Sequence, residues 1–459
     1  MNTLSEDDPG GPAPDRRAEA VFYLAAIAVG AIAGTIGTIL NLGTARVLTW
    51  PDRVVAHFGS ASPAALLTTG AFGAAMVVAS LWLVRTFAPE AGGSGVQETE
   101  GAMVGLRRVR WLRVLLVKFF GAILSLGSGL VVGREGPSIH IGACIAQAFN
   151  VWLRLPVRDA HGMLAAGGAA GLAAAFSAPL ASIIFVIEET RREFPYSLKT
   201  YTGVMLASVA SGIVTLAIAG RRPFMAMTVP EVPLVWLPAF VVLGILLGGL
   251  GVVFNRTLIW ALDTTRAIGL RWSFYIGPAF IGFVIGILLL VLPEATKGGE
   301  NLAVRLAEAN LPLTIIAFII VVRFAMSMAS YATGVPGGIF APILSLATAV
   351  GLFFGLCLGE ILPLPEGGAA AFAVAAMGGL FTSTVRSPLV GIVLIAELTG
   401  AYTVLVPAIV TCTFANFIAD WLGGRPIYTV LLERTLKLSP ANDILPPNAD
   451  QKSAADRQE

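Results

Sequence analysis

Charged residues are scarce in this chain of 459 residues. Asp, Glu, Lys and Arg together make up 13% of it, about half the share of roughly 25% that is usual for a soluble domain. Hydrophobic residues make up 56%, and the mean hydropathy is +0.81. This composition argues against a soluble globular protein and favours one that crosses a membrane several times.

Cysteine and histidine are also rare, with three of each. Cys144, Cys357 and Cys412 lie singly within apolar runs, without the spacing of a disulfide framework or a metal site, so we expect small buried hydrophobic residues. The sequence has no HExxH motif and no aspartate-rich motif within an apolar run. We therefore expect neither an enzyme nor a bound cofactor, and the net charge of only +2 gives no reason to expect a nucleic-acid partner.

Long apolar runs are abundant, and about 20 apolar residues suffice for a helix to cross a bilayer. Each such run predicts membrane-embedded helix. The uncharged windows are 21–45, 60–84, 162–187, 202–220, 232–255, 272–293, 324–359, 367–385 and 398–419.

The two ends of the chain differ from this apolar middle. Residues 1–18 are rich in Pro, Gly and charge, which predicts a disordered tail, and 436–459 form a short C-terminal tail. Arg16 and Arg17 precede the first apolar run, so we expect both termini in the cytoplasm and the protein in the cell inner membrane or plasma membrane. The basic cluster at 107–118 is expected to lie at a headgroup interface.

The sequence repeats itself at an offset of about 205–209 positions. SAPLASIIFVIEE (177–189) resembles RSPLVGIVLIAEL (386–398), and GREGPSIHIGACIAQAF (133–149) matches the position of GIFAPILSLATAVGLFF (338–354). Two repeats, about 19–220 and 232–435, favour a transporter whose substrate lies between them at helices broken near the membrane midplane.

The motifs GREGP (133–137) and GGIFAP (337–342) are the natural starts of such broken helices. Proline is tolerated in a first helical turn, and the glycines let the backbone approach a ligand closely. Two converging helix N-termini would bind an anion through partial positive charge. A full positive charge there would hold the ion too tightly for release.

Two further segments carry polar side chains next to apolar runs. GGSGVQE (92–98) contains Ser94 among glycines, and taken alone it is typical of a flexible linker. GGRPIYTVL (423–431) contains Tyr428, which by itself is compatible with an interfacial aromatic residue.

Together these four segments resemble the chloride channel and proton/chloride antiporter (CLC) family, of the prokaryotic type without a cytoplasmic regulatory domain. The similarity covers roughly 20–435. It implies an all-α polytopic membrane protein in which two inverted-topology repeats, with broken and tilted helices, meet at a central anion site. It also implies a homodimer in the lipid bilayer with one pathway in each subunit.

The resemblance implies roles for individual residues. Ser94 and Tyr428 are expected to donate hydroxyl hydrogen bonds to the anion, and Ile339 and Phe340 to donate backbone N–H groups. Glu135 is expected to be the external gating glutamate. When ionised it is itself an anion that competes with chloride for the site.

Glu189 takes the position of the internal proton-transferring glutamate in IEETRREF (187–194). From the residues alone, Glu188 and Glu189 would more often be a helix end paired with Arg191 or Arg192. We list Glu188 as a possible supporting residue, together with a pair between Glu100 and Arg134.

Gln97 departs from the family pattern, which has proline at this place in GSGxP, and we expect a looser turn there. The retained Ser94 favours chloride over other anions. Proton-coupled chloride antiport gated by Glu135 is therefore the expected function. A passive chloride channel of the same fold, or transport of another small anion, remains the alternative.

Overall fold

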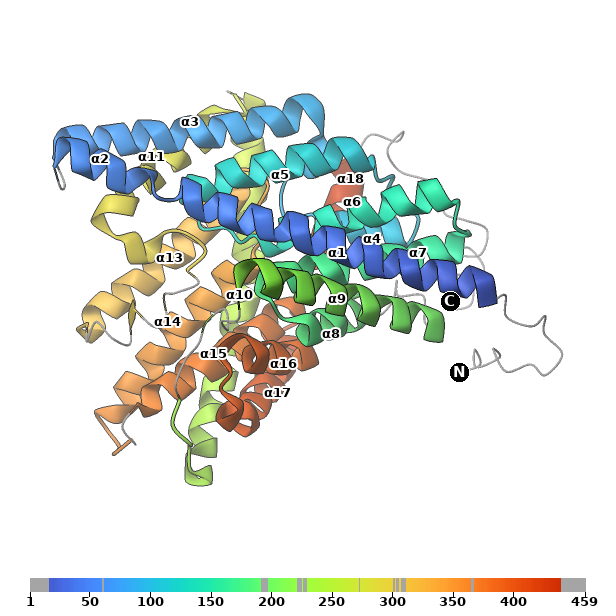
Figure 1. The fold of residues 1–459 in the computed structure, drawn as a ribbon. Coiled ribbons are helices and arrows are strands. Elements are labelled where there is room, and N and C mark those ends of the chain that lie inside the picture. The colour runs from blue at the N-terminus through green and yellow to red at the C-terminus, as the bar shows by residue number, and fades with distance from the viewer. Residues whose placement is uncertain are drawn as a thin grey trace.

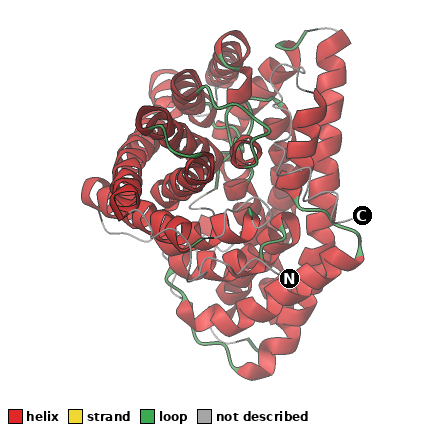
Figure 2. Ribbon diagram, turned by 90° about the vertical axis from the view of Figure 1, so that its right-hand side faces the viewer, coloured by secondary structure: helices red, strands yellow, loops and turns green. Residues whose placement is uncertain are grey.

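The computed structural model describes residues 16–59, 62–190, 197–220, 225, 229–271, 273–299, 302, 305–306, 311–364 and 367–438. Within these residues the protein is helical, and the only strand-like pairings are two isolated bridges (Figure 2). Eight of the described helical segments are long and apolar enough to cross a membrane. The predicted all-α membrane architecture is therefore confirmed.

The first half of the chain forms nine α-helices and one short 3₁₀ helix among the described residues. They are α1 (Arg16–Val47), α2 (Trp50–Phe58), α3 (Pro63–Phe87), η1 (Pro89–Ala91), α4 (Val96–Met103), α5 (Trp111–Gly127), α6 (Glu135–Leu153), α7 (Val157–Phe176), α8 (Pro179–Glu189) and α9 (Leu198–Ala219). Helix α1 begins at Arg16 and so includes the last three residues of the expected N-terminal tail; residues 1–15 lie outside the described residues.

The second half repeats much of this order. Its described elements are η2 (Leu234–Trp236), α10 (Leu237–Arg271), α11 (Ile276–Val291), η3 (Pro293–Ala295), α13 (Leu313–Ala332), α14 (Phe340–Gly359), α15 (Gly368–Val385), α16 (Pro388–Thr399), η4 (Tyr402–Val404), α17 (Leu405–Trp421) and α18 (Ile427–Leu438). Helix α18 continues into the expected C-terminal tail as far as Leu438. Figure 1 shows this half packed against the first rather than forming a separate body.

The repeat is visible in backbone details as well as in helix order. The sequence Pro-Glu-Ala forms a 3₁₀ helix in each half, at η1 and at η3. Ser177 and Arg386, which follow α7 and α15, both have positive φ, at 55° and 73°. Left-handed backbone is uncommon for residues other than glycine, so its recurrence 209 positions later marks the same turn.

One apolar window does not form the single span that its length suggests. Residues 162–187 are divided between α7 and α8, because the chain turns at Ser177 and α8 starts afresh with Pro179 in its first turn. The break within 324–359, between α13 and α14, falls at the predicted helix start in GGIFAP. Broken helices of this kind are tolerated at membrane depth where protein surrounds them.

The helices cross closely where small residues meet. A side-chain carbon on Gly142 of α6 would collide with the backbone of Gly167 on α7, and one on Gly351 of α14 would collide with the backbone of Phe372 on α15. Small residues permit such close contact between helices in membranes. These crossings bring α6 and α14 deep into the protein, where their N-termini meet.

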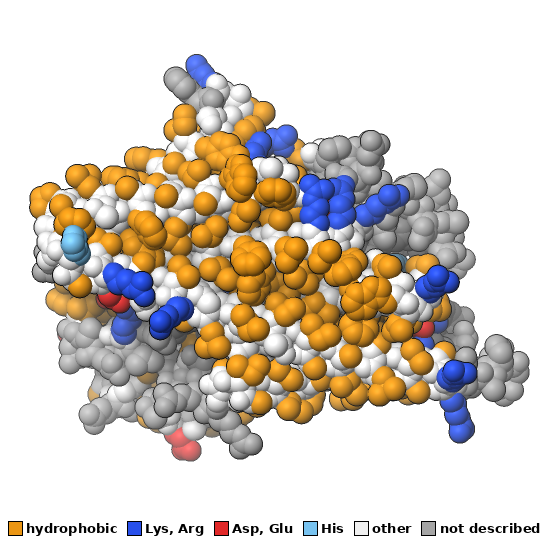
Figure 3. Space-filling view, turned by 45° about the horizontal axis from the view of Figure 1, so that its top comes forward, with side chains coloured by type: hydrophobic (Ala, Val, Ile, Leu, Met, Phe, Trp, Pro, Cys, Tyr) orange, Lys and Arg blue, Asp and Glu red, His pale blue; other side chains and the backbone are white. Residues whose placement is uncertain are grey.

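The outer surface is suited to lipid. In Figure 3 hydrophobic side chains cover most of the visible face, and Lys and Arg side chains gather toward its margins. Leu24, Leu67, Phe120 and Trp82 are among the exposed apolar residues. An apolar surface this broad would be unfavourable in water but not in a bilayer.

Candidate anion site

Two pairs of loops join the repeats at the centre of the protein. Gly133 and Gly338 exchange two backbone hydrogen bonds, each 2.7 Å long. Gly93 donates its N–H to Val335 O at 3.2 Å and accepts from the N–H of Gly337 at 3.0 Å. The antiparallel exchange between Gly133 and Gly338 is what a local two-fold axis would produce, as expected for inverted repeats.

Three helices begin beside these loops. Helix α4 starts after Gly95, whose φ is +91°, α6 starts at Glu135, and α14 starts at Phe340. None of the three N-cap residues makes a side-chain capping hydrogen bond. The first N–H groups of a helix have no intrahelical partner and carry partial positive charge, so they favour an anion.

Ser94 lies against the start of α6. A side-chain carbon on Gly136 would be 2.6 Å from Ser94 O and 2.9 Å from Ser94 Cα. The Ser94 side chain is 1% exposed, and its Oγ has no hydrogen-bond partner among the described residues. A buried hydroxyl without a hydrogen-bond partner lowers the stability of the folded protein by about 1–3 kcal/mol. An anion that accepts a hydrogen bond from it would offset this loss.

Glu135 is fully buried at the same place. A side-chain carbon on Gly133 would collide with its carboxylate, and one on Gly338 would lie 3.5 Å from its Oε2 and 3.0 Å from the backbone nitrogen of Gly136. The carboxyl group therefore lies folded against the junction of the two repeats. At this junction a negative charge lies beside the N-termini of α6 and α14.

Aromatic rings close the site on the side of α8 and α18. The ring of Phe340 lies 5.0 Å from Phe176, 5.9 Å from Phe185 and 4.4 Å from Phe381, between ring centroids. Phe185 lies 6.4 Å from Tyr428, which is also buried. These rings exclude water, so polar groups that remain among them act in a medium of low dielectric constant.

The aromatic cluster has carboxylates around it. Glu135, Glu189 and Glu100 all lie close enough to Tyr428 to act on its hydroxyl electrostatically. The structure thus brings Ser94, Glu135 and Phe340 to one centre and Tyr428 to its aromatic border. Ile339, the N-cap of α14, lies directly before Phe340.

Glu189 and Glu188 end α8, and their side chains bond to the second repeat. Ser387 donates its hydroxyl to Glu189 Oε2 at 2.7 Å. Glu188 accepts the backbone N–H groups of Leu389 at 3.2 Å and Val390 at 2.8 Å, at the start of α16. The alternative partners Arg191 and Arg192 lie outside the described residues.

Glu397, which the sequence interpretation did not single out, mirrors Glu188. Its carboxylate accepts the backbone N–H groups of Leu180 at 3.2 Å and Ala181 at 2.7 Å, at the start of α8. Each repeat thus supplies a carboxylate that caps a helix of the other. The signal was present in the sequence, since Glu397 occupies the place of Glu188 in the repeated apolar run.

The expectation that the cluster at 107–118 lies at a headgroup interface is wrong for two of its members. Lys118 is fully buried and donates to Ala91 O at 3.1 Å and Gly93 O at 2.7 Å. Arg107 is also largely buried and bonds to Glu98 at 2.8 Å. Buried carbonyl and carboxylate oxygens compensate these cations for lost water, and Lys118 thereby fixes the loop that carries Ser94.

Arg323 is the counterpart of Lys118 in the second repeat. It is fully buried and donates to the carbonyl oxygens of Glu294 at 2.9 Å, Thr296 at 3.1 Å, Lys297 at 3.1 Å and Gly298 at 2.7 Å. Each repeat therefore holds the loop after its 3₁₀ helix with a buried cation.

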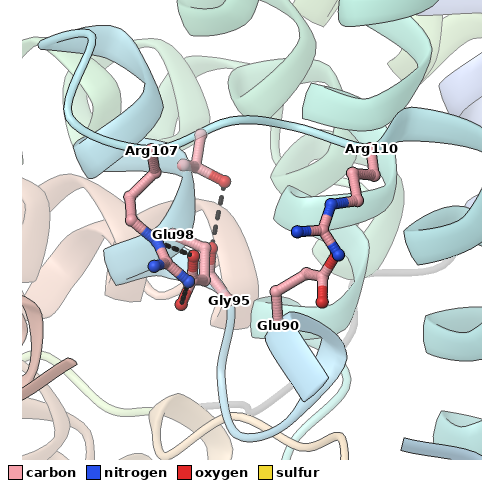
Figure 4. Close-up of polar contacts among 6 residues, drawn as sticks. Glu90, Gly95, Glu98, Arg107 and Arg110 are labelled. Atoms are coloured by element: carbon pink, nitrogen blue, oxygen red, sulfur yellow. Dashed lines mark hydrogen bonds and ion pairs between the residues drawn. The ribbon is translucent and has the colours of Figure 1, made fainter. Parts of the chain in front are cut away.

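A cavity of about 360 Å³ leads toward the Ser94 loop and is lined by Gly93, Gln97 and Arg107 among others. Figure 4 shows the ion pairs at its edge, Glu98 with Arg107 and Glu90 with Arg110. Although Gln97 replaces proline, α4 still begins at Val96. The turn is thus formed without proline.

Arg134 and Glu100 line different cavities. Arg134 lies with Asn41 and Lys297, and Glu100 lies with Thr99 and Thr190. The pairing of Glu100 with Arg134 stays a prediction. Among the described residues, no group of three His, Cys, Asp or Glu side chains could hold a metal ion.

Comparison with known proteins agrees with this geometry. The family model described as voltage gated chloride channel matches residues 73–420. The chain belongs to this family. It is 41% identical to the H(+)/Cl(-) exchange transporter ClcA of Vibrio campbellii, over 91% of this chain and 90% of that protein. It is 39% identical to the transporter of the same name from Salmonella paratyphi B, over 90% and 89%.

Solved structures of this family share the fold. A slow cyanobacterial Cl-/H+ antiporter superposes with a TM-score of 0.86 at 35% identity, covering 91% of this chain and 99% of that one. A CLC-type fluoride/proton antiporter superposes with a TM-score of 0.71 at 20% identity, over 89% and 97%. At that identity the second likeness concerns the fold alone.

Proposed function

We propose that this protein exchanges chloride for protons across a bilayer, with Glu135 as the gate. The observation that carries the proposal is the buried Ser94 hydroxyl, which lacks a hydrogen-bond partner among the described residues, beside three uncapped helix N-termini. Membership of the family and the names of the ClcA relatives supply chloride and protons as the transported ions.

Four residues would bind the anion. Ser94 would donate its hydroxyl, and Ile339 and Phe340 would donate backbone N–H groups at the start of α14. Tyr428 would donate its hydroxyl from the aromatic border. All of these donors are neutral, so the ion is held by dipoles and can leave again.

Glu135 would act as a tethered competitor of chloride. Its carboxylate lies against the same helix starts that favour an anion, so carboxylate and chloride exclude one another. A proton on Glu135 removes its charge and lets chloride take its place. Glu189, on the far side of the aromatic cluster, would pass protons to and from the other face, so chloride and protons move in opposite directions.

We further propose a homodimer in the cell inner membrane or plasma membrane with both termini in the cytoplasm. Arg16 and Arg17 open α1, and basic residues beside a first span favour the cytoplasmic side. Light scattering of the purified protein would give the mass of two chains, and protease protection in vesicles would report the side of each terminus.

The test of exchange is a flux measurement in liposomes under an imposed chloride gradient. Chloride moving down its gradient should drive protons the other way. Glu135→Gln and Glu189→Gln should each abolish proton movement and leave chloride flux. Glu433→Gln removes a carboxylate from exposed surface of α18 and serves as the matched control, with coupling unchanged.

Two results would contradict the proposal. Chloride flux without proton movement in the unaltered protein would show that it is a passive channel and not an exchanger. Coupling that persists in Glu189→Gln would leave Glu189 as a structural residue that only binds Ser387. A panel of anions in the same liposomes would reveal a preference for an ion other than chloride.

A further inference from the structure

A second, larger cavity lies near the C-terminal end of α1 and is separate from the cavity lined by Gly93 and Gln97. Its volume is about 510 Å³, and its lining includes Asn41, Thr44, Arg134, Lys297 and Arg305. Because α1 begins at Arg16 and ends at Val47, this cavity lies toward the opposite face from the N-terminus. Arg134 directly precedes the gating glutamate.

The charged side chains that the structure describes in the lining of this cavity are all positive. Among the described residues that line it, the charged ones are Arg134, Lys297 and Arg305, and none of them is a carboxylate. Asp52 and Glu294 act electrostatically on Lys297 but do not line the cavity. A concave surface of one sign concentrates ions of the other.

Two donors of the lining, and the acceptor Asn41 Oδ1, have hydrogen-bonding capacity that the described residues do not use. Arg305 Nε and Thr44 Oγ1 are buried and have no hydrogen-bond partner among the described residues. Thr44 as a whole is only 6% exposed. Buried polar atoms are almost always satisfied, so the guanidinium N–H and the hydroxyl leave room for an acceptor, while Asn41 Oδ1 leaves room for a donor.

The backbone carbonyl oxygens of Lys297 and Gly298 would repel an anion, and they are occupied elsewhere, whereas the side-chain oxygen of Asn41 is not. The carbonyls of Lys297 and Gly298 accept hydrogen bonds from Arg323, at 3.1 and 2.7 Å. They therefore belong to the protein interior and do not offer their negative ends to an anion in the cavity. The loop contributes the Lys297 ammonium group without competing acceptors.

The size and donor geometry favour an anion larger than chloride. Ligand pockets typically have volumes of about 300–1,000 Å³, and this cavity falls in that range at about 510 Å³. Guanidinium groups present a planar fork that suits the several oxygens of a phosphate better than a single spherical ion. We infer that this cavity binds a phosphate-class oxyanion, either free phosphate or the headgroup of an anionic phospholipid.

A bound oxyanion would also restrain transport, an effect that rests on the proposed function. It would hold Arg134 and place negative charge on the approach to Glu135. Chloride and protons would then reach the gate more slowly from this face. Binding itself does not depend on transport and is measured separately.

The first experiment is calorimetric titration of the purified full-length protein with inorganic phosphate and pyrophosphate in chloride-free gluconate buffer. We expect one site in each chain and at least tenfold weaker binding in Arg305→Gln and Lys297→Gln. Thr44→Val provides a further test that leaves all charges in place, and it should also weaken binding. Arg46→Gln removes an exposed charge from the same end of α1 and should bind as the unaltered protein does.

Absence of binding would overturn the inference. An equal loss of affinity in Arg46→Gln and Arg305→Gln would overturn it too, because the general positive charge of this surface, and not specific contacts in the cavity, would then attract the ion. Stoichiometric displacement of pyrophosphate by an equal concentration of chloride would overturn it too. Circular dichroism of each variant establishes that it is folded.

Nanodiscs distinguish the two sources of the oxyanion. If a lipid headgroup occupies the cavity, nanodiscs of phosphatidylglycerol should block phosphate binding, whereas nanodiscs of phosphatidylcholine should not. If free phosphate is the ligand, both should bind it equally. Either result supports an oxyanion site, and failure to bind in both kinds of nanodisc overturns it.

Transport then tests the consequence. Phosphate on the Arg134 side should slow chloride flux of the unaltered protein and not of Arg305→Gln. If phosphate binds but chloride flux is unchanged, the site exists but does not regulate transport. Absence of proton coupling with intact phosphate binding would instead count against the proposed exchange function, so the two failures are distinguishable.

Discussion

The contact between Gly136 and Ser94 makes a sharp prediction about the anion site. In Gly136→Ala the added carbon would lie 2.6 Å from Ser94 O and 2.9 Å from Ser94 Cα, whereas ordinary contacts are 3.4–4 Å. The carbon would also collide with the Ser94 hydroxyl, and rotation of that hydroxyl cannot relieve the two contacts with backbone atoms. The start of α6 and the Ser94 loop must separate by about 0.8 Å to restore van der Waals distance.

This displacement is large for a site built from converging donors. Binding groups need to be held to within about 0.5 Å of their productive positions. Overpacking of this kind typically costs about 1–3 kcal/mol of stability. We expect chloride affinity to fall by about tenfold or more, which corresponds to about 1.4 kcal/mol.

The assay is isothermal titration of purified protein with chloride, accompanied by thermal unfolding in the same detergent. Gly249→Ala is the matched control, because Gly249 lies within α10 and an added carbon there meets nothing within 4 Å. That substitution should leave chloride binding unchanged and stabilise the protein by about 0.5–1 kcal/mol, since alanine is the better helix former.

Unchanged chloride affinity in a folded Gly136→Ala protein would refute the reasoning. It would mean that the Ser94 loop and the start of α6 can move independently of the ion. Ser94 would then no longer be part of a shared anion site, whatever the fate of Glu135.

Three other predictions concern the surrounding framework. Glu397→Gln should destabilise the protein by about 1–2 kcal/mol in thermal unfolding, because two charge-assisted hydrogen bonds become neutral ones. Lys118→Met should weaken chloride binding in calorimetry and lower stability by about 2 kcal/mol, because it releases the carbonyls that position Ser94; equal affinity would separate Lys118 from the site. The hydrogen bond from Arg425 holds the pKa of Glu433 below its usual range. The exposed pair of Arg425 and Glu433 should therefore contribute less than about 1 kcal/mol to the free energy of unfolding. This contribution is present above the pKa of glutamate in the unfolded state, about 4.3, and is lost as the pH falls through the pKa in the folded state. A stability difference between Glu433→Gln and the unaltered protein that grows toward acid pH would contradict it.

Much of the central site was predictable because its signals are local. Gly-Pro motifs mark helix starts, and the uncapped starts of α6 and α14 occur where GREGP and GGIFAP predicted them. The charge of Lys118, in contrast, gave no local sign of its partners, since its acceptors lie 25 and 27 positions earlier in the chain. Comparing it with Arg323 at the repeat offset would have suggested a buried role.

Sequence by itself determined that this is a membrane protein of two repeats, and it predicted helix starts that favour an anion. Composition and short motifs are sufficient for that, because lipid demands apolar runs and helix N-termini carry partial positive charge wherever they lie. Only the tertiary structure decided which groups meet. The crosswise caps of Glu188 and Glu397, the isolated hydroxyl of Ser94 and the basic cavity at Arg305 all depend on residues that are distant in the chain. These arrangements exist only once the two repeats have packed together.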